Sequence, residues 1–375
     1  MKRKVFCGID NINDYENLFE NKKIALITNQ TGVNRELKTT IEIINEKYNL
    51  VCMLSPEHGV RGFCQAGDKV DFYIDQQTNL PVFSLYGKSP HISESVINSI
   101  DIIVFDVQDV GARFYTYLYT LSYAMEDCAK FQKQLIVLDR PNPILKKGTM
   151  GSILNMEFSS FVGKFPLATA YGLTIGEYAK MINQTQQINC NLAVISMKNY
   201  SRDLLFSDTD LCFISPSPNL PTIDSCLCYI GTCLFEGTNI SEGRGTTKPF
   251  ETIGATFLNP QQIIKDVKIK GAILRECYFS PTFSKFQNEI CKGVQIHITN
   301  IDDFNGFEAG LLLLDYIRKN YKEFEFLKAD KYFITLLLGS DEILKPDFDA
   351  EKFILLENQK REIYSETIKK YYLYK

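Results

Sequence analysis

Short apolar runs alternate with helical patterns through the first half of the chain. Each apolar run has the length and the β-branched content of a buried strand, and the runs fall at residues 24–27, 50–54, 82–85, 102–105 and 135–138. Between most of these runs lie segments whose apolar residues recur at helical spacing, at residues 39–48, 93–99 and 116–130. A repeated strand–helix–strand order predicts a parallel sheet with helices on both faces, which is an α/β fold.

The α/β pattern continues to about residue 196. Thr174 can cap a helix while Glu177 closes a capping box, so a helix is expected from there to about residue 183. A further strand is expected at residues 192–196. Residues 215–221 then contain three prolines in six positions, which forbids regular structure and predicts a domain crossing.

We therefore expect two domains, residues 1–222 and residues 223–375. The second is predicted to be a smaller α+β domain that covers a cleft of the first. Residues 292–299 alternate like a half-buried strand, residues 305–319 have the pattern of an apolar-faced helix, and residues 341–375 are expected to be helical.

Composition excludes several classes of protein. Hydrophobic residues make up 45% and charged residues 23%, which is ordinary for a globular chain, and the net charge of −4 provides no basic field for nucleic acid. The apolar runs are too short to insert into a membrane. No export signal is visible at the start, so a cytoplasmic location is expected, or export if a signal has been removed. The oligomeric state is not readable from the sequence.

Eleven cysteines, an odd number, predict reduced and mostly buried thiols. Cys226, Cys228 and Cys233 lie closest together, and we interpret them as small side chains that fill a strand region. No paired Cys-x-x-Cys spacing suits zinc, and the chain has three histidines, so we expect no metal. Because Trp is absent, the 20 Tyr and 26 Phe supply the large aromatic surfaces of the chain.

Polar residues follow four of the predicted strands, next to turn-forming Gly or Pro. Ligands of open parallel sheets bind beyond the carboxyl ends of the strands, so these residues are expected to meet in one crevice. They comprise Asn29, Glu57, His58, Arg61, Asp106, Gln108, Asp109, Arg113, Tyr115, Asp139, Arg140 and Asn142. A fifth polar cluster, at residues 235–247, adds Glu236, Asn239, Glu242 and Arg244.

Known nucleotide and hydrolase motifs are missing from these loops. Residues 235–247 lack the glycine spacing and the Lys-Ser/Thr ending of a phosphate-binding loop, and a solvated surface loop is the alternative for this segment. No Gly-x-Gly-x-x-Gly follows the first strand, which disfavours a dinucleotide cofactor, and no Gly-x-Ser-x-Gly supports a serine hydrolase triad. We expect no cofactor.

Paired carboxylates among Arg, Asn and Tyr suit cleavage of a glycosidic bond, in which one carboxyl group protonates the leaving oxygen and a second activates water or stabilises the cationic centre. Glu57 is the candidate acid, with His58 or Arg61 beside it. Glu236, Glu242, Asp106 and Asp109 compete for the second role. An ordinary helix cap or ion pair is the alternative for each carboxylate taken singly.

Ordered strings of these residues resemble the NamZ-like exo-β-N-acetylmuramidases over nearly the whole chain. The matching strings lie at residues 26–33, 56–62, 85–87, 105–117, 138–143, 217–222, 235–239 and 241–247. The resemblance implies a Rossmann-like catalytic domain with a smaller domain over the cleft. It also implies release of N-acetylmuramic acid from the non-reducing end of peptidoglycan fragments, without metal or nucleotide. Glu57 would be the acid, and the loop that begins at Glu236 would close over the sugar.

Two positions depart from the family pattern. Ser55 stands where Gly is usual, and Tyr171 stands where a His usually precedes the following helix, which puts substrate preference and rate in question. The lactyl carboxylate of the sugar calls for a cation, and Arg61, Arg113, Arg140 and Arg244 are candidates. Two other functions stay open: a hydrolase of another acidic or phosphorylated amino sugar, and a muropeptide-binding protein without catalysis.

Overall fold

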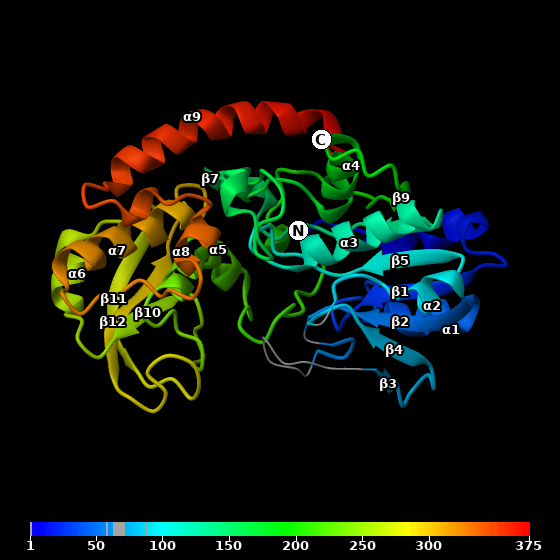
Figure 1. The fold of residues 1–375 in the computed structure, drawn as a ribbon, viewed down its shortest axis with the longest axis horizontal. Coiled ribbons are helices and arrows are strands. Elements are labelled where there is room, and N and C mark those ends of the chain that lie inside the picture. Colours follow the sequence, from blue (N-terminus) through cyan, green and yellow to red (C-terminus); the bar gives the residue numbers. More distant parts are fainter. Residues whose placement is uncertain (1, 58, 63–71, 88) are drawn as a thin grey trace.

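The computed structural model describes residues 2–57, 59–62, 72–87 and 89–375. Within them, two lobes lie side by side, with a long C-terminal helix across one side of both (Figure 1). The strands are β1 Lys23–Thr28, β2 Asn49–Ser55, β3 Tyr73–Ile74, β4 Pro81–Ser84, β5 Ile102–Asp106, β6 Gln134–Leu138, β7 Met150–Ile153, β8 Ala168–Ala170, β9 Asn191–Ile195, β10 Thr252–Ala255, β11 Ala272–Phe279 and β12 Cys291–Ile298. The α-helices are α1 Thr40–Lys47, α2 Glu94–Asn98, α3 Tyr117–Lys130, α4 Ile175–Thr185, α5 Ile223–Thr232, α6 Pro260–Asp266, α7 Gly306–Asn320, α8 Phe333–Leu338 and α9 Ala350–Ile368.

The first lobe contains a sheet in the order β3-β4-β2-β1-β5-β6-β9. All its neighbouring strands are parallel except β3 and β4, which are antiparallel. Successive residues of β1 face opposite sides: Ile24 and Leu26 join the core under α1, while Ala25 and Ile27 join the core under α3. The predicted α/β fold is therefore confirmed, with helices on both faces of the sheet.

The chain runs outward from β1 to β2 and β4, then crosses back to place β5 on the other side of β1. Loops after β1 and β5 consequently leave in opposite directions, and a crevice opens between them at the carboxyl edge of the sheet. The predicted helix start at residue 174 is confirmed, because Thr174 and Glu177 form a capping box. Strand β3 and the pair β7–β8 were not predicted, since each is very short.

The second lobe contains a three-stranded antiparallel sheet in the order β10-β12-β11. Helices α5 and α7 approach closely at Gly231 and Gly310, where a Cβ atom on Gly231 would lie 2.0 Å from the carbonyl oxygen of Gly306. The interpretation of Cys226, Cys228 and Cys233 as strand residues is wrong. Cys226 and Cys228 lie in α5 and Cys233 in the 3-10 turn after it, where the small thiols fit the same close helix packing.

The C-terminal residues return to the first lobe. Helix α9 spans the molecule, and its end lies near α4 (Figure 1). The Tyr374 hydroxyl then donates to Asp139 at 2.5 Å, and the Leu373 amide donates to Glu177 at 2.8 Å. The predicted division of the chain at residue 222 stays a prediction. No helix in the described part of the chain is both long and apolar enough to cross a membrane.

Candidate active site

The carboxyl ends of β2, β1, β5 and β6 lie next to one another in the sheet. The loops that follow these four strands carry most of the predicted site residues. The parallel order therefore brings together segments that are up to about a hundred residues apart in the sequence. His58, one of the predicted residues, lies outside the described part of the chain.

Glu57 follows the buried end of β2 and is half-buried. Its Oε2 atom accepts a hydrogen bond from the Thr116 hydroxyl at 2.9 Å. Tyr86 also hydrogen-bonds to this carboxylate, and burial together with the neighbouring Glu57 raises the pKa of the Tyr86 phenol to about 12. The carboxyl group of Glu57 is thus held by two hydroxyl donors while part of the side chain stays open to solvent.

The backbone around Glu57 is fixed by Tyr117, the first residue of α3. Asn29, after β1, donates to the Tyr117 hydroxyl at 2.9 Å. That hydroxyl lies 2.8 Å from the carbonyl oxygen of Pro216 and 3.3 Å from that of Glu57, and its single proton serves one of them at a time. Asn29 therefore positions the Tyr117 hydroxyl, which links the Glu57 loop to the proline-rich segment at residues 215–221.

Asp109 is a buried carboxyl group with one unsatisfied oxygen. Its Oδ2 atom accepts from the Gly111 amide at 2.6 Å and from the Tyr171 hydroxyl at 2.5 Å. Its Oδ1 atom has no hydrogen-bond partner among the described residues. Burial raises the pKa of Asp109 to about 7, against the opposing effect of the Tyr171 hydrogen bond. Asp109 therefore carries a proton much of the time near neutral pH.

Asp106 and Arg140 form a buried ion pair under the crevice. The guanidinium Nε atom of Arg140 lies 2.5 Å from Oδ1 of Asp106, and Nη2 lies 2.8 Å from Oδ2. Thr40 donates to the same carboxylate. Both side chains are almost fully buried, so the pair joins two strand ends and does not face solvent.

Asp139 is a buried carboxyl group that accepts hydrogen bonds from other parts of the protein. It accepts from the Gly176 amide and the Thr174 hydroxyl, both at 2.8 Å, and from Tyr374. Burial raises its pKa to about 6. Asp139 thus ties the start of α4 and the C-terminus to the end of β6.

Four further predicted residues hold loops in place. Arg113 is fully buried and donates to the carbonyl oxygens of Ser152, Leu167 and Leu337, which belong to three separate segments. Burial lowers its pKa to about 10. The side chains of Gln108 and Asn142 donate to the backbone carbonyls of Pro141 and Leu173. Arg61 donates two hydrogen bonds to Asp75, from Nε to Oδ1 at 3.1 Å and from Nη2 to Oδ2 at 2.9 Å.

The second lobe contributes a compact charge network. Arg244 donates to Oε1 of Glu236 through Nε at 3.0 Å and Nη2 at 2.5 Å, and its Nε lies 3.4 Å from Glu242. Lys285 binds Oε2 of Glu242 at 2.7 Å. Burial raises the pKa of Glu236, while Arg244 opposes that effect. Glu236 keeps 20% of its side chain exposed and Glu242 only 2%, so Glu236 is the more open of the two carboxylates.

Asn239 lies apart from this charge network. Its side chain donates to the Glu323 carbonyl at 2.7 Å and accepts from the Glu325 amide at 3.0 Å. These bonds hold the loop after Glu236 to the segment before α8, so Asn239 shapes the loop.

A chain of aromatic rings connects Glu57 to the second lobe. The ring centroids of Tyr117 and Tyr115 lie 4.7 Å apart, those of Tyr115 and Tyr229 6.2 Å, and those of Tyr229 and Phe250 4.6 Å. Arg244 then lies 5.1 Å over the Phe250 ring. Because these rings are buried, the Glu57 loop and the Glu236 network are held against one packed layer. The hydroxyl of Tyr115 has no partner among the described residues.

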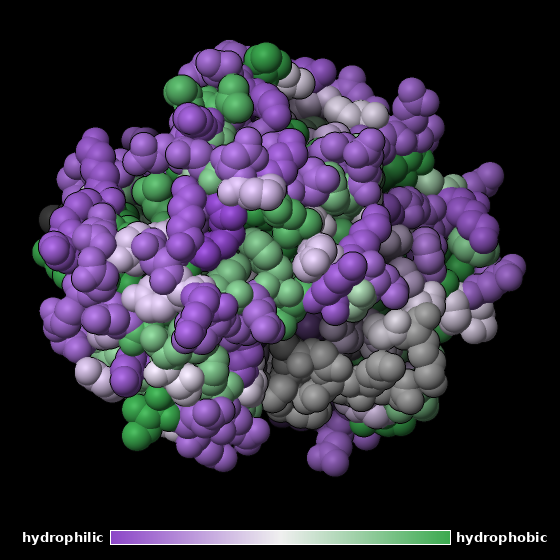
Figure 2. Space-filling model, turned by 60° about the vertical axis from the view of Figure 1, so that its left-hand side comes forward, coloured by the Kyte–Doolittle hydropathy of each residue, from purple (hydrophilic) through white to green (hydrophobic). Residues whose placement is uncertain are grey.

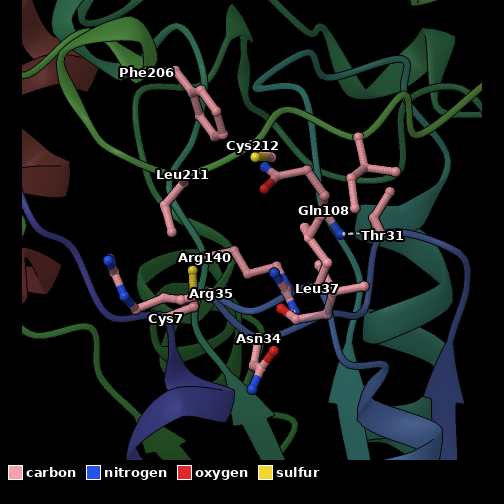
Figure 3. Close-up of a pocket in the computed structure, with 12 residues that line it drawn as sticks. Cys7, Thr31, Asn34, Arg35, Leu37, Gln108, Arg140, Phe206, Leu211 and Cys212 are labelled. Carbon is pink, nitrogen blue, oxygen red and sulfur yellow. Dashed lines mark hydrogen bonds between the residues drawn. The ribbon is translucent and has the colours of Figure 1, made fainter. Parts of the chain in front are cut away.

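A small cavity lies at the crevice between β1 and β5 (Figure 3). The backbone amide of Gln108 donates a hydrogen bond to the Thr31 hydroxyl at 2.9 Å. Figure 3 shows this bond, with Arg140 and Arg35 nearby. Arg35 is paired with Asp210 and Arg140 with Asp106. Because Arg35 and Arg140 are already paired with carboxylates, neither arginine of this cavity is available to bind a substrate anion.

Sequence reasoning missed the residues that hold Glu57. Tyr86, Thr116 and Tyr117 occur within the matching strings, but no spacing rule links them to Glu57. Lys285 and Asp75 were also missed, since each pairs with a residue at least 14 positions away. No group of three or more His, Cys, Asp or Glu side chains in the described part of the chain could hold a metal ion.

Family models match both lobes of the chain. The model described as exo-beta-N-acetylmuramidase NamZ, N-terminal, matches residues 24–224, and the corresponding C-terminal model matches residues 227–374. The peptidoglycan beta-N-acetylmuramidase NamZ of Bacillus subtilis (strain 168) is 43% identical over 383 residues, which cover 100% of this chain and 92% of the relative.

Two crystal structures of DUF1343 family proteins from Bacteroides fragilis NCTC 9343 share the fold. One has a TM-score of 0.91 at 32% identity, with all of both chains covered. The other has a TM-score of 0.80 at 30% identity, with 99% of both chains covered. The similarity thus extends over both lobes and their connection.

Proposed function

The chain belongs to the NamZ family of exo-β-N-acetylmuramidases, and from this premise we propose that it releases N-acetylmuramic acid from the non-reducing end of peptidoglycan fragments. One structural observation carries the proposal beyond the family match. Glu57 stands half-buried after the end of β2, where the Thr116 and Tyr86 hydroxyls hold its carboxyl group beside an aromatic groove. A carboxyl group in that setting is suited to give and take a proton.

Glu57 is proposed as the acid. In the reaction, the bond between the anomeric carbon and the leaving oxygen breaks, and the proton of Glu57 passes to that oxygen. The oxygen of a water molecule forms a new bond to the anomeric carbon, and a second carboxylate takes the proton that the water loses. No cofactor is needed for this balance.

Glu236 is the proposed second carboxylate. It is the more exposed member of the second-lobe network, and a single arginine, Arg244, grips it. Glu242 is almost fully buried between Arg244 and Lys285, which suits a residue that positions Arg244. Asp109 is the remaining candidate, but it is only 3% exposed, against 20% for the Glu236 side chain.

Arg61 and Arg244 are the proposed partners for the lactyl carboxylate. Their side chains keep 26% and 20% of their surface exposed. Arg113 and Arg140 are almost fully buried, which leaves them unsuited to a substrate carboxylate.

Glu57→Gln tests the assignment with two β-linked N-acetylmuramides, one carrying a sugar leaving group and one carrying 4-nitrophenol. Loss of a general acid should lower turnover of the sugar-linked substrate by about 10²–10⁴-fold. The loss should be smaller for nitrophenol, because a nitrophenolate departs without being protonated.

Glu46→Gln is the matched control, since it makes the same change at an exposed position in α1. Equal turnover in wild type and Glu57→Gln would contradict the acid role. A wild-type enzyme that releases no N-acetylmuramic acid from either substrate would contradict the proposed function.

A further inference from the structure

An aromatic groove opens beside Glu57 on the first lobe. It has a volume of about 350 Å³, within the range of small-molecule sites, about 300–1,000 Å³. Its lining includes Tyr86, Pro90, Thr116, Thr120, Tyr123 and Phe161. No residue of the second-lobe charge network is among the residues that line it.

Two of the lining residues are the donors that hold Glu57. Thr116 donates to its carboxylate at 2.9 Å, and Tyr86 hydrogen-bonds to the same group. The groove is therefore continuous with the proposed acid. A general acid must lie within hydrogen-bonding reach of the leaving oxygen, so the leaving group occupies space next to the acid.

The surface chemistry of the groove selects a neutral ring. Phe161 is 64% exposed, and its ring stacks on Phe333 of α8 at 6.2 Å. Tyr123 is half-buried on α3, with the Lys164 ammonium held over its ring at 3.7 Å. Thr116 and Thr120 place hydroxyl groups one helical turn apart along the same side.

No charged side chain appears among the described residues of the lining. The Lys164 ammonium over Tyr123 is paired with Glu126 at 2.6 Å, so the described residues here offer no unpaired cation for a phosphate or a peptide carboxylate. Aromatic faces with a few hydroxyl groups suit a pyranose, whose apolar face packs on a ring while its hydroxyls form hydrogen bonds. Hydrophobic side chains also gather in the middle of the face shown in Figure 2, between hydrophilic margins.

We propose that this groove is the leaving-group site, where the sugar on the reducing side of the scissile bond lies against Phe161 and Tyr123. The inference rests on the proposed function. It goes beyond that function by assigning the contacts that recognise the second sugar. Binding there would hold the leaving oxygen at Glu57, so the groove contributes to turnover of substrates that carry a second ring.

The test compares two substrates that differ in the leaving group. One is a β-linked disaccharide with N-acetylmuramic acid at its non-reducing end, and the other is N-acetylmuramyl β-fluoride, whose leaving group is a single atom. Phe161→Ala should lower kcat/KM for the disaccharide about 10-fold more than for the fluoride, the effect of losing one aromatic contact of roughly 1.4 kcal/mol. Tyr123→Leu should do the same.

Tyr278→Ala is the matched control, because Tyr278 is 61% exposed on β11 of the second lobe. It should leave the ratio of the two kcat/KM values unchanged. Phe161→Leu keeps an apolar side chain without a ring, and it should show the same preferential loss as Phe161→Ala while guarding against misfolding.

An equal loss on both substrates, or no loss on either, would overturn the leaving-group site. Such a result would leave the proposed function standing, because wild type would still release N-acetylmuramic acid. If wild type cleaved neither substrate, the proposed function itself would fail, and the two failures are therefore distinguishable.

Discussion

Thr116 precedes helix α3 and donates its hydroxyl to Glu57, 2.9 Å away, while its oxygen accepts no capping hydrogen bond from the amides of the helix. Threonine at this position usually caps the helix, which contributes about 0.5–2 kcal/mol. Here the hydroxyl holds a carboxylate from a different strand end. The side chain of Thr116 thus orients the proposed acid and does not cap its own helix.

Thr116→Val tests that orientation, because it removes the hydroxyl and keeps the shape of the side chain. A hydrogen bond to a charged group contributes about 1.5–3 kcal/mol, so turnover should fall by roughly 10–100-fold. The free energy of unfolding should change little, since no cap bond is lost. Thr116→Ser keeps the donor and should retain most of the activity, and a Ser variant as impaired as the Val variant would contradict this role.

Glu236 and Glu242 should respond differently to neutralisation. Glu236→Gln should lower turnover by about 10²–10⁴-fold with small loss of stability, as expected for a carboxylate that acts on the reacting water. Glu242→Gln should lower stability, because Lys285 and Arg244 lose the charge they pair with in a buried place. Steady-state kinetics and urea unfolding of both variants provide the comparison. A larger activity loss in Glu242→Gln would reverse the assignment.

Asp109 makes stability depend on pH. Its folded pKa, about 7, lies above the ordinary value of 3.8, so the folded state binds more protons between these two values. The free energy of unfolding should therefore fall as pH rises through that window, by up to about 4 kcal/mol. Asp109→Asn removes the titration, and urea unfolding between pH 4 and pH 8 should show a shallower decline. Parallel curves for wild type and variant would contradict the raised pKa.

The buried pair of Asp106 and Arg140 should be needed for folding and not for binding. Arg140→Met leaves an uncompensated buried carboxylate and should destabilise the protein by about 3–5 kcal/mol. The double variant Asp106→Leu/Arg140→Met should recover much of that loss, which a double-mutant cycle in urea would measure. A double variant that sums the two single losses would show that the residues act independently.

The elements of the first lobe were predictable from local patterns. Strand β1 has an apolar centre at residues 24–27, and helix α4 starts at the capping box of Thr174 and Glu177, so neighbouring residues suffice to specify each. Strand β3 has two residues and β7 has four, which is too short for a periodic signal. The three cysteines at 226–233 were assigned to a strand because small apolar residues suit either kind of packing.

The parallel sheet, the row of polar strand ends and the family motifs are readable from the sequence, because each depends on residues close together in the chain. Which polar side chains are buried against other protein groups and which stay accessible to solvent depends on the tertiary structure. Asp139 is engaged by Tyr374, 235 positions away, and Arg113 by Leu337, 224 positions away. Glu57 accepts hydrogen bonds from Thr116, 59 positions away, and from Tyr86. A carboxylate or a guanidinium has the same local sequence signature in both settings, and its chemistry depends on the partners that folding supplies.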